Sequence, residues 1–305
     1  MKSVIVAATA IYCTVAFLNA AAAQDAGTMP SQWVGFGEHQ FDHEFESDID
    51  SGGSLAVTRA RTQAGILYMQ SPRNSIGVAL RYGYHGYDFG GTAGFGGLNP
   101  WGDVREWAVG VPYRLGIGSD WDLMAVASVQ GLAEYDASWD ESVTASGILT
   151  LSYRVSDDFR IGPGLGIATE IEDDVSVFPF LLIDWQINDV LSLSTRGAER
   201  AVNGPQAVLS WQVEPEWSLA FGAGREELRF RLDDSGVAPG GVGQGETYPV
   251  FASLTYGQKR GFQAFLFGGY KLGGELTLED SNGTFIAGSD YDDQPFLGVG
   301  LRMTW

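Results

Sequence analysis

Residues 297–305 alternate strictly between apolar side chains and polar or small ones. The apolar set is Leu297, Val299, Leu301, Met303 and Trp305, and the positions between them carry Gly298, Gly300, Arg302 and Thr304. Because successive side chains of a β-strand point to opposite faces of its sheet, this pattern predicts a strand with one apolar face and one polar or small face. Such a strand, ending on an aromatic residue, is unusual in a soluble protein.

The first 23 residues have the pattern of a secretory signal peptide. Lys2 supplies the positive charge, residues 4–18 are apolar, and an Ala-x-Ala cleavage site precedes Gln24. Cys13 is the only cysteine and lies in this leader, so we expect neither disulfides nor thiol chemistry in the exported chain. No later stretch is apolar for long enough to predict a spanning helix. The chain is therefore expected in the periplasm, in the medium or in the outer membrane.

Charge and glycine content narrow the choice of partners and folds. Without Lys2 the exported chain has a net charge of roughly −21, against −20 for the whole chain. This charge repels nucleic acid, so no nucleic-acid partner is predicted. The 42 glycines are spread through the expected strands rather than gathered in a linker. Strongly curved strands tolerate glycine where a side chain would be crowded.

Short polar breaks alternate along the chain with longer or more acidic connections. The short breaks are residues 71–74, 118–120, 156–158, 188–189, 214–216 and 258–260, and the other connections are 47–53, 89–103, 137–141, 172–174, 201–204, 233–245 and 279–292. Counting the segments between them predicts about 14 strands, the first over residues 32–46. That first segment alternates weakly, so residues 24–53 could instead form in part a periplasmic or lumenal segment, with 12 strands remaining as the alternative.

Aromatic residues of the apolar faces gather beside the short breaks. They are Tyr113, Trp121, Tyr153, Phe159, Trp185, Trp211, Trp217, Tyr256, Phe262 and Trp305, and a thinner row at Tyr84, Trp107, Tyr135, Tyr248 and Tyr270 lies toward the longer connections. In a tilted strand, the spacing from Tyr248 to Tyr256 covers roughly 20 Å of height. Since such rings prefer the headgroup level of a membrane, the two rows predict girdles at its two surfaces.

The leader, the last strand and the girdles together resemble bacterial outer-membrane β-barrel proteins, and the size is similar to that of small monomeric 14-strand porins. The resemblance implies a signal peptide over residues 1–23 and one all-β domain over residues 24–305, a transmembrane antiparallel up-and-down barrel with short periplasmic turns and longer extracellular loops. It also implies a porin-like passive diffusion channel for small solutes, without a cofactor. The implied partners are outer-membrane lipids, lipopolysaccharide and the barrel assembly machinery, which would recognise the C-terminal strand. The oligomeric state stays open.

The polar positions of the strands predict the inner face of such a barrel. Its charged members are Arg81, Arg114, Asp122, Glu134, Arg154, Arg160, Glu170, Asp184, Arg196 and Arg302. Because a charge at mid-depth in hydrocarbon costs roughly 2–4 kcal/mol, these side chains must line water or pair with one another. A pore with solute preference set by charge is one hypothesis, and a lumen closed by arginine–carboxylate pairs is the other. The space inside 14 strands favours the pore.

A second inward-facing set is apolar and allows a different function. Phe178, Phe180 and Leu182 share one expected strand, and Phe251, Phe265, Phe267 and Phe296 lie on three successive later strands. They predict packing against an inward-folded loop or, alternatively, a lumenal pocket for a hydrophobic solute or lipid. The second option would suit a transporter of hydrophobic compounds. A structural or adhesive barrel is a third possibility. In addition, the apolar parity flips between Ala223 and Leu228, which predicts a β-bulge or an extension beyond the membrane.

No motif in the sequence predicts an enzyme or a metal site. The histidines His39, His43 and His85 belong to no His-Glu-x-x-His motif, and no Gly-x-Ser-x-Gly elbow occurs. The acidic connections do not match an EF-hand loop, so they predict solvated surface, with cation binding beside lipopolysaccharide as the alternative. Their aspartates are Asp48, Asp50, Asp233, Asp234, Asp280, Asp290, Asp292 and Asp293.

Overall fold

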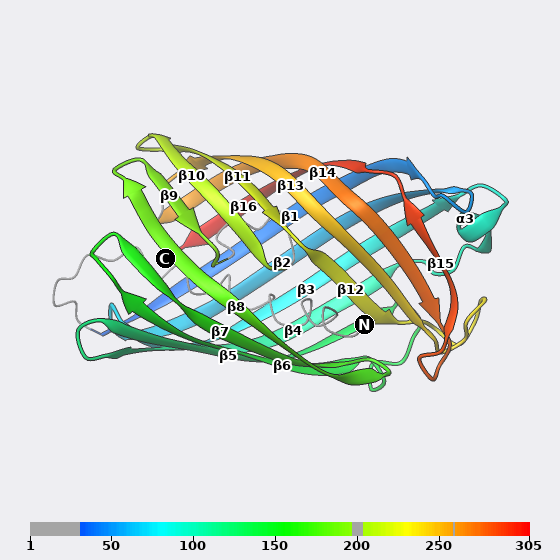
Figure 1. Ribbon diagram of the computed structural model, residues 1–305, viewed down its shortest axis with the longest axis horizontal. Helices are drawn as coiled ribbons and strands as arrows, with labels where there is room; N and C mark the ends of the chain where they lie inside the picture. Colours follow the sequence, from blue (N-terminus) through cyan, green and yellow to red (C-terminus); the bar gives the residue numbers. More distant parts are fainter. Residues whose placement is uncertain (1–30, 197–203, 259) are drawn as a thin grey trace.

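The computed structural model describes residues 31–196, 204–258 and 260–305, and these residues are mostly β-strand (Figure 1). The strands are β1 (Gln32–Asp48), β2 (Ser54–Ser71), β3 (Asn74–Gly90), β4 (Val104–Ile117), β5 (Trp121–Glu134), β6 (Val143–Arg154), β7 (Phe159–Glu170), β8 (Asp173–Asn188), β9 (Leu191–Ser194), β10 (Gln206–Glu214), β11 (Trp217–Gly224), β12 (Glu226–Arg231), β13 (Val242–Gly257), β14 (Gly261–Glu279), β15 (Phe285–Tyr291) and β16 (Gln294–Thr304). One short helix, α3 (Gly94–Leu98), follows β3. Within these ranges no helix is long and apolar enough to span a bilayer. The predicted signal peptide lies outside the described residues.

Fourteen strands close into one antiparallel barrel, and β12 and β15 are additions to it. Neighbours in sequence are neighbours in the sheet, and β1 closes the cylinder against β16, with Phe36 opposite Thr304. The predicted all-β barrel of 14 strands is confirmed. The weakly alternating first segment is a barrel strand, β1, so the alternative of 12 strands is wrong.

The turns separate by length between the two ends of the barrel (Figure 1). All six short breaks predicted from the sequence connect consecutive strands at one end, here called the periplasmic end. Helix α3 and the longer connections within the described residues lie at the other, extracellular end, and residues 201–203 of the expected connection 201–204 lie outside the described residues. Two expected connections contain more than two residues of strand. Residues 279–292 contain β15, which pairs with β14 from Gly274 opposite Tyr291 onward, and β13 begins at Val242 inside the expected connection 233–245.

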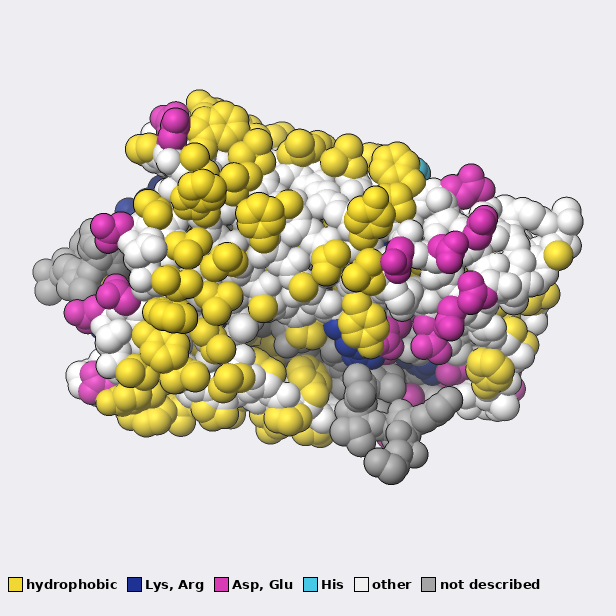
Figure 2. Space-filling view, turned by 45° about the horizontal axis from the view of Figure 1, so that its top comes forward, with side chains coloured by type: hydrophobic (Ala, Val, Ile, Leu, Met, Phe, Trp, Pro, Cys, Tyr) yellow, Lys and Arg dark blue, Asp and Glu magenta, His cyan; other side chains and the backbone are white. Residues whose placement is uncertain are grey.

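The outside of the barrel carries a broad belt of exposed apolar side chains (Figure 2). On β16, Leu297, Val299, Leu301 and Met303 are each about half exposed, whereas the intervening Gly298 and Gly300 face inward. A water-soluble sandwich would bury such a face under a second sheet, and no second layer covers it in the described part of the chain. Exposed apolar surface of this extent requires hydrocarbon around it.

Aromatic residues border the belt at the periplasmic end. Of the ten predicted girdle residues, Tyr113, Trp121, Tyr153, Trp185, Trp211, Trp217, Tyr256, Phe262 and Trp305 are exposed and Phe159 is half-buried. Several pair directly across neighbouring strands, as Trp121 does with Tyr153 at 4.9 Å between ring centroids and Trp217 with Tyr256 at 4.7 Å. At the other border, the guanidinium of Arg105 lies 4.3 Å from the ring centre of Tyr135.

On one side, the barrel extends beyond the apolar belt at the extracellular end. After Arg225 the chain leaves β11 and forms β12, which pairs with the upper part of β13 and touches β5 through Arg231 opposite Ala133. The predicted parity flip is thus a strand extension. At this level the barrel is completed by β12, β13, β14, β15, β1, β2, β3, β4 and β5, with Tyr291 of β15 bridged to Ile49 beyond β1. In contrast, the pairing of β11 with β13 ends at Ala223 opposite Val250.

A hydrophobic core fills this extension and forms a cap. Its buried members are Ile49, Leu55, Val57, Phe95, Trp101, Val104, Leu132, Leu228, Phe230, Leu232, Ala238, Leu276, Leu278 and Tyr291. Trp101 lies at its centre, with its ring 5.3 Å from those of Phe89 and Phe230 in edge-to-face contacts. Side chains fill the interior of barrels of about eight strands. The extension is similarly narrow, so its interior is filled by the side chains of the cap.

Candidate functional site

The inner wall of the barrel is the candidate functional site. The nine predicted pore-lining residues are Arg81, Arg114, Glu134, Arg154, Arg160, Glu170, Asp184, Arg196 and Arg302; eight lie on the inward parity of their strands, and Arg196 lies buried just beyond β9. The structure places five of them together near the periplasmic end, pairs Arg81 and Arg302 within the wall, and places Glu134 and Glu170 at the extracellular end. Their role in lining a pore stays a prediction.

The first group forms an arginine band near the periplasmic end, defined as Arg73, Arg114, Arg154, Arg160 and Arg196. The side chain of Asp122, on β5, is 4% exposed and faces three of them. One oxygen, Oδ1, lies 3.0 Å from Nε of Arg73 and 3.8 Å from Nη2 of Arg114, and Oδ2 lies 4.0 Å from Nη1 of Arg160. Oδ2 of Asp184, on β8, lies 3.2 Å from Nη2 of Arg196. Two carboxylates thus face five guanidinium groups.

A second group of charges is buried at mid-height, where β12 begins. Glu226 lies 3.1 Å from Arg59 of β2 and also contacts Lys271 of β14. Both cations contact Glu44 of β1 as well. All four side chains are at most 7% exposed, and two carboxylates balance two cations. This buried ion cluster joins the extension to the opposite wall, and the sequence analysis did not identify it.

Arg81 belongs to the same level of the wall and is also paired. Its Nη2 lies 2.5 Å from Glu106 of β4, whose other oxygen lies 3.2 Å from Nε2 of the fully buried His85. Nearer the periplasmic end, Nε of Arg302 lies 2.6 Å from Glu38 of β1. These groups are neutralised within the wall, in contrast to the arginine band.

Glu134 and Glu170 are the last residues of β5 and β7 and support the extracellular structure. Glu134 accepts the backbone N–H groups of Gly102 at 2.7 Å and Asp233 at 3.0 Å, which fixes two loops of the cap. Glu170 accepts from the hydroxyl of Ser176 at 2.5 Å at the turn between β7 and β8. Burial raises the pKa of the Glu170 carboxyl.

The predicted hydrophobic lumen residues are packed against the wall. Phe251, Phe265 and Phe267 cluster with Phe296, Val208 and Ala220, and all are buried. Phe178 and Phe180 are half-buried beside Leu182. Each of the five predicted phenylalanines lies over the glycine directly opposite on a neighbouring strand, at positions 222, 300, 298, 166 and 164 respectively. The rings therefore lie along the wall.

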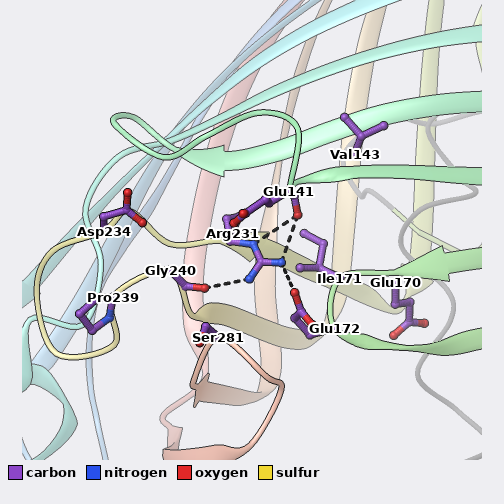
Figure 3. A pocket seen from close by; sticks show the side chains of 10 residues that line it. All are labelled: Glu141, Val143, Glu170, Ile171, Glu172, Arg231, Asp234, Pro239, Gly240 and Ser281. Carbon is purple, nitrogen blue, oxygen red and sulfur yellow. Dashed lines mark hydrogen bonds and ion pairs between the residues drawn. The ribbon is translucent and has the colours of Figure 1, made fainter.

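A pocket of about 470 Å³ lies beside the cap at the extracellular end (Figure 3). Its walls come from the loop between β5 and β6, the turn between β7 and β8, and the loop between β12 and β13. Arg231 holds these parts together: it donates to the backbone oxygens of Glu141 at 3.2 Å and Gly240 at 2.8 Å, and to the carboxylate of Glu172 at 2.5 Å. The other charged side chains in its lining are acidic, namely Glu141, Glu170 and Asp234.

The extracellular surface is strongly acidic where the extension emerges (Figure 2). Some of its aspartates have a structural role: Asp280 accepts the N–H groups of Asn282 and Thr284 at 2.9 Å, and these bonds lower the pKa of its carboxyl. Among the described residues, no group of three or more potential ligands is arranged to hold a metal ion. The charge along the axis therefore changes from negative at the outer rim to positive at the arginine band.

Comparison with known proteins finds similar folds at low identity. An outer-membrane channel from Pseudomonas putida F1 shares 11% identity, over 93% of this chain and 98% of that chain, with a TM-score of 0.48. The monoaromatic hydrocarbon channel TodX, as a deletion mutant, shares 10% over 97% and 96%, with a TM-score of 0.41, and the porin NanC shares 8% over 87% and 98%, with a TM-score of 0.38. No protein-family model and no curated protein sequence matches the chain.

The closed antiparallel barrel, its lipid-facing belt and its aromatic borders define a transmembrane β-barrel. In such barrels the backbone hydrogen bonds are satisfied between strands, which allows them to cross hydrocarbon. The fold is that of an outer-membrane β-barrel.

Proposed function

We propose that the protein is a porin-like channel through which small solutes diffuse passively across the outer membrane. The observation that supports this most directly is the arginine band, five guanidinium groups on the inner wall that meet two carboxylates. Charged groups on an inner wall need water or a charged solute beside them, since unpaired burial is costly. A water-filled passage at this level supplies that environment.

The route of the solute at the extracellular end is set by the cap. Because the cap is packed with apolar side chains on the side of β1–β5 and β12–β16, we propose that the passage opens beside it, over β6, β7 and β8. The pocket around Arg231 and Glu170 lies on that side. A solute would then pass the acidic rim, the pocket and finally the arginine band.

The alternative transporter of hydrophobic compounds has less support. Its candidate pocket would be formed by Phe251, Phe265 and Phe267, yet these rings are 2–9% exposed and contact the wall. These rings cover glycines of neighbouring strands and leave little of their surface for a ligand. Half-buried Phe178 and Phe180 are the part of this set that could still contact a solute.

We also propose that the protein is not an enzyme. His85 is the histidine on the inner wall, and its side-chain contact is with Glu106, which is itself paired with Arg81. His39 and His43 hydrogen-bond to Thr62 and Thr58 on the outward parity of β1 and β2. The described residues thus offer no histidine beside a nucleophile at the lumen.

Single-channel recording on the refolded, leader-free protein in planar bilayers tests the channel. Stepwise conductance that scales with salt concentration is expected. A protein that is folded, as judged by heat-modifiable gel migration, and yet shows no steps would refute the channel. Retention of lipid or hydrocarbon that is lost in a Phe178→Ser, Phe180→Ser variant would then favour the transporter.

A further inference from the structure

Within the described residues, the arginine band carries more positive charge than the neighbouring carboxylates neutralise. Its five guanidinium groups meet Asp122 and Asp184, which leaves an excess of three positive charges among these seven side chains. The wall above shows the opposite situation, because the buried ion cluster is balanced within itself. The excess is therefore a local property of the periplasmic end.

The register of the strands brings like charges together there. Arg154 of β6 lies directly opposite Arg160 of β7, an arrangement that is unfavourable without an anion between the two groups. Arg160 in turn lies opposite Asp184 of β8, whose carboxylate is already bound by Arg196. Arg154 and Arg160 thus have little negative charge near them among the described residues.

Several donors of the band lack an acceptor in the described part of the chain. The Nε atoms of Arg154 and Arg196 are buried and have no hydrogen-bond partner there. Arg114 is 5% exposed, and its nearest carboxylate oxygen, on Asp122, is 3.8 Å away, beyond a normal hydrogen bond. A guanidinium in such surroundings binds an oxyanion strongly, because its planar set of donors matches carboxylate and phosphate oxygens.

We propose that the arginine band is a binding site for small oxyanions, such as carboxylates and phosphate or sulfate groups, and that it makes the passage anion-selective. The proposal rests on the proposed channel for its transport role, but binding itself does not need conduction. The anion would lie against Arg154 and Arg160, with Arg114 and Arg196 beside it, and would supply the negative charge that the described part of the wall lacks.

The test uses Arg154→Gln with Arg160→Gln, which removes the facing pair while keeping polar side chains. Arg105→Gln is the matched control, because it removes one positive charge on the outside of the barrel. All variants are refolded without the leader in an uncharged detergent, so no lipid phosphate is present, and heat-modifiable migration confirms their folding.

The first measurement is thermal unfolding with increasing inorganic phosphate at constant ionic strength. We expect phosphate to raise the unfolding temperature of the wild type and of Arg105→Gln. In the double variant, the apparent affinity for phosphate should be lower than in the wild type by about tenfold or more. Equal phosphate responses in the wild type and the double variant would overturn the site. If added phospholipid, but not phosphate, raised the unfolding temperature to a saturating value, the band would bind a lipid headgroup, and the proposal would also be overturned.

The second measurement is the reversal potential in a potassium chloride gradient. A preference for chloride that falls in the double variant and not in Arg105→Gln supports anion selectivity. A cation-selective or non-selective wild type would refute the selectivity while leaving the channel itself in place. A protein that binds phosphate at the band but never conducts would instead refute the channel and retain the site.

Discussion

The ring of Phe251 lies over the backbone of Gly222, its direct partner across the pair of β11 and β13. A Cβ at position 222 would lie 2.4 and 2.7 Å from two atoms of that ring, so the ring would have to move. The same relationship joins Phe265 to Gly300 and Phe180 to Gly164. Aromatic side chains cover glycines in this way because the ring shields a backbone that has no side chain of its own. The high glycine content of the chain is thus partly explained by pairs of ring and glycine on the inner wall.

Gly222→Ala should destabilise the barrel by about 1–3 kcal/mol, since the ring of Phe251 has to leave its place. Combining it with Phe251→Ala should cost less than the sum of the two single changes, by about 1 kcal/mol or more. Urea unfolding in detergent measures both. Gly147→Ala is the control, because the nearest atom to a Cβ there is 3.6 Å away. Additive effects of the two substitutions would show that the residues are not coupled.

Glu226→Ala should destabilise the extension by about 3–5 kcal/mol, because Arg59 and Lys271 would keep only Glu44 as a buried counter-charge. Hydrogen exchange of β12 and the upper part of β13 reports this locally. As a comparison, Glu46→Ala removes an exposed carboxylate that accepts from Ser54, and it should leave exchange in β12 unchanged. Equal protection of β12 in both variants would contradict the assigned role of the cluster.

The extension should loosen as the pH rises through neutrality. Glu227 lies on β12, above the aromatic row that includes Tyr248 and hence outside the apolar belt. Burial raises the pKa of its carboxyl to about 8 from an ordinary 4.5; Arg225 opposes this rise, and Glu246 and Glu170 add to it.

Folded Glu227 therefore holds a proton between pH 4.5 and 8 that the unfolded chain releases, so its contribution to stability falls across that window as the pH increases. Proteolysis within residues 232–241 should become faster from pH 5.5 to 8.5, and Glu227→Gln should reduce this dependence. The same pH dependence in both proteins would assign the effect to another group.

Thiol labelling should locate the extracellular opening, because the chain without its leader has no cysteine. A bulky thiol reagent should lower the conductance of Glu170→Cys, whose side chain lines the pocket. It should not affect Leu98→Cys, which is exposed on α3 at the cap. Block at position 98 alone would show that solutes enter through the cap.

The strands, their order and the lipid-facing positions could be predicted because they depend on local patterns. Alternation with a period of two identifies the apolar face of β16, and polar breaks locate the short turns. β15 was missed because its residues do not alternate with a period of two: Phe285, Ile286 and Ala287 are apolar in succession, and small or polar residues follow them up to Asp290.

Ion pairs between side chains that are distant in the sequence could not be predicted from it. The alternation of β2 places Arg59 and Arg61 inward, but nothing local shows that Arg59 meets Glu226, 167 residues further along. The same holds for Arg73, which lies in a turn and still reaches Asp122. Ion pairs across a lumen depend on the register and curvature of the whole barrel, which single-strand patterns do not contain.

The separation of charge along the axis makes the two directions of flow unequal. An anion arriving from outside passes the acidic rim and the pocket before it reaches the guanidinium groups. One arriving from the periplasm passes only the short turns, with exposed carboxylates such as Asp157 and Asp158, before it reaches them. Currents carried by anions should therefore differ in size when the voltage is reversed, so that the barrel behaves as a rectifier.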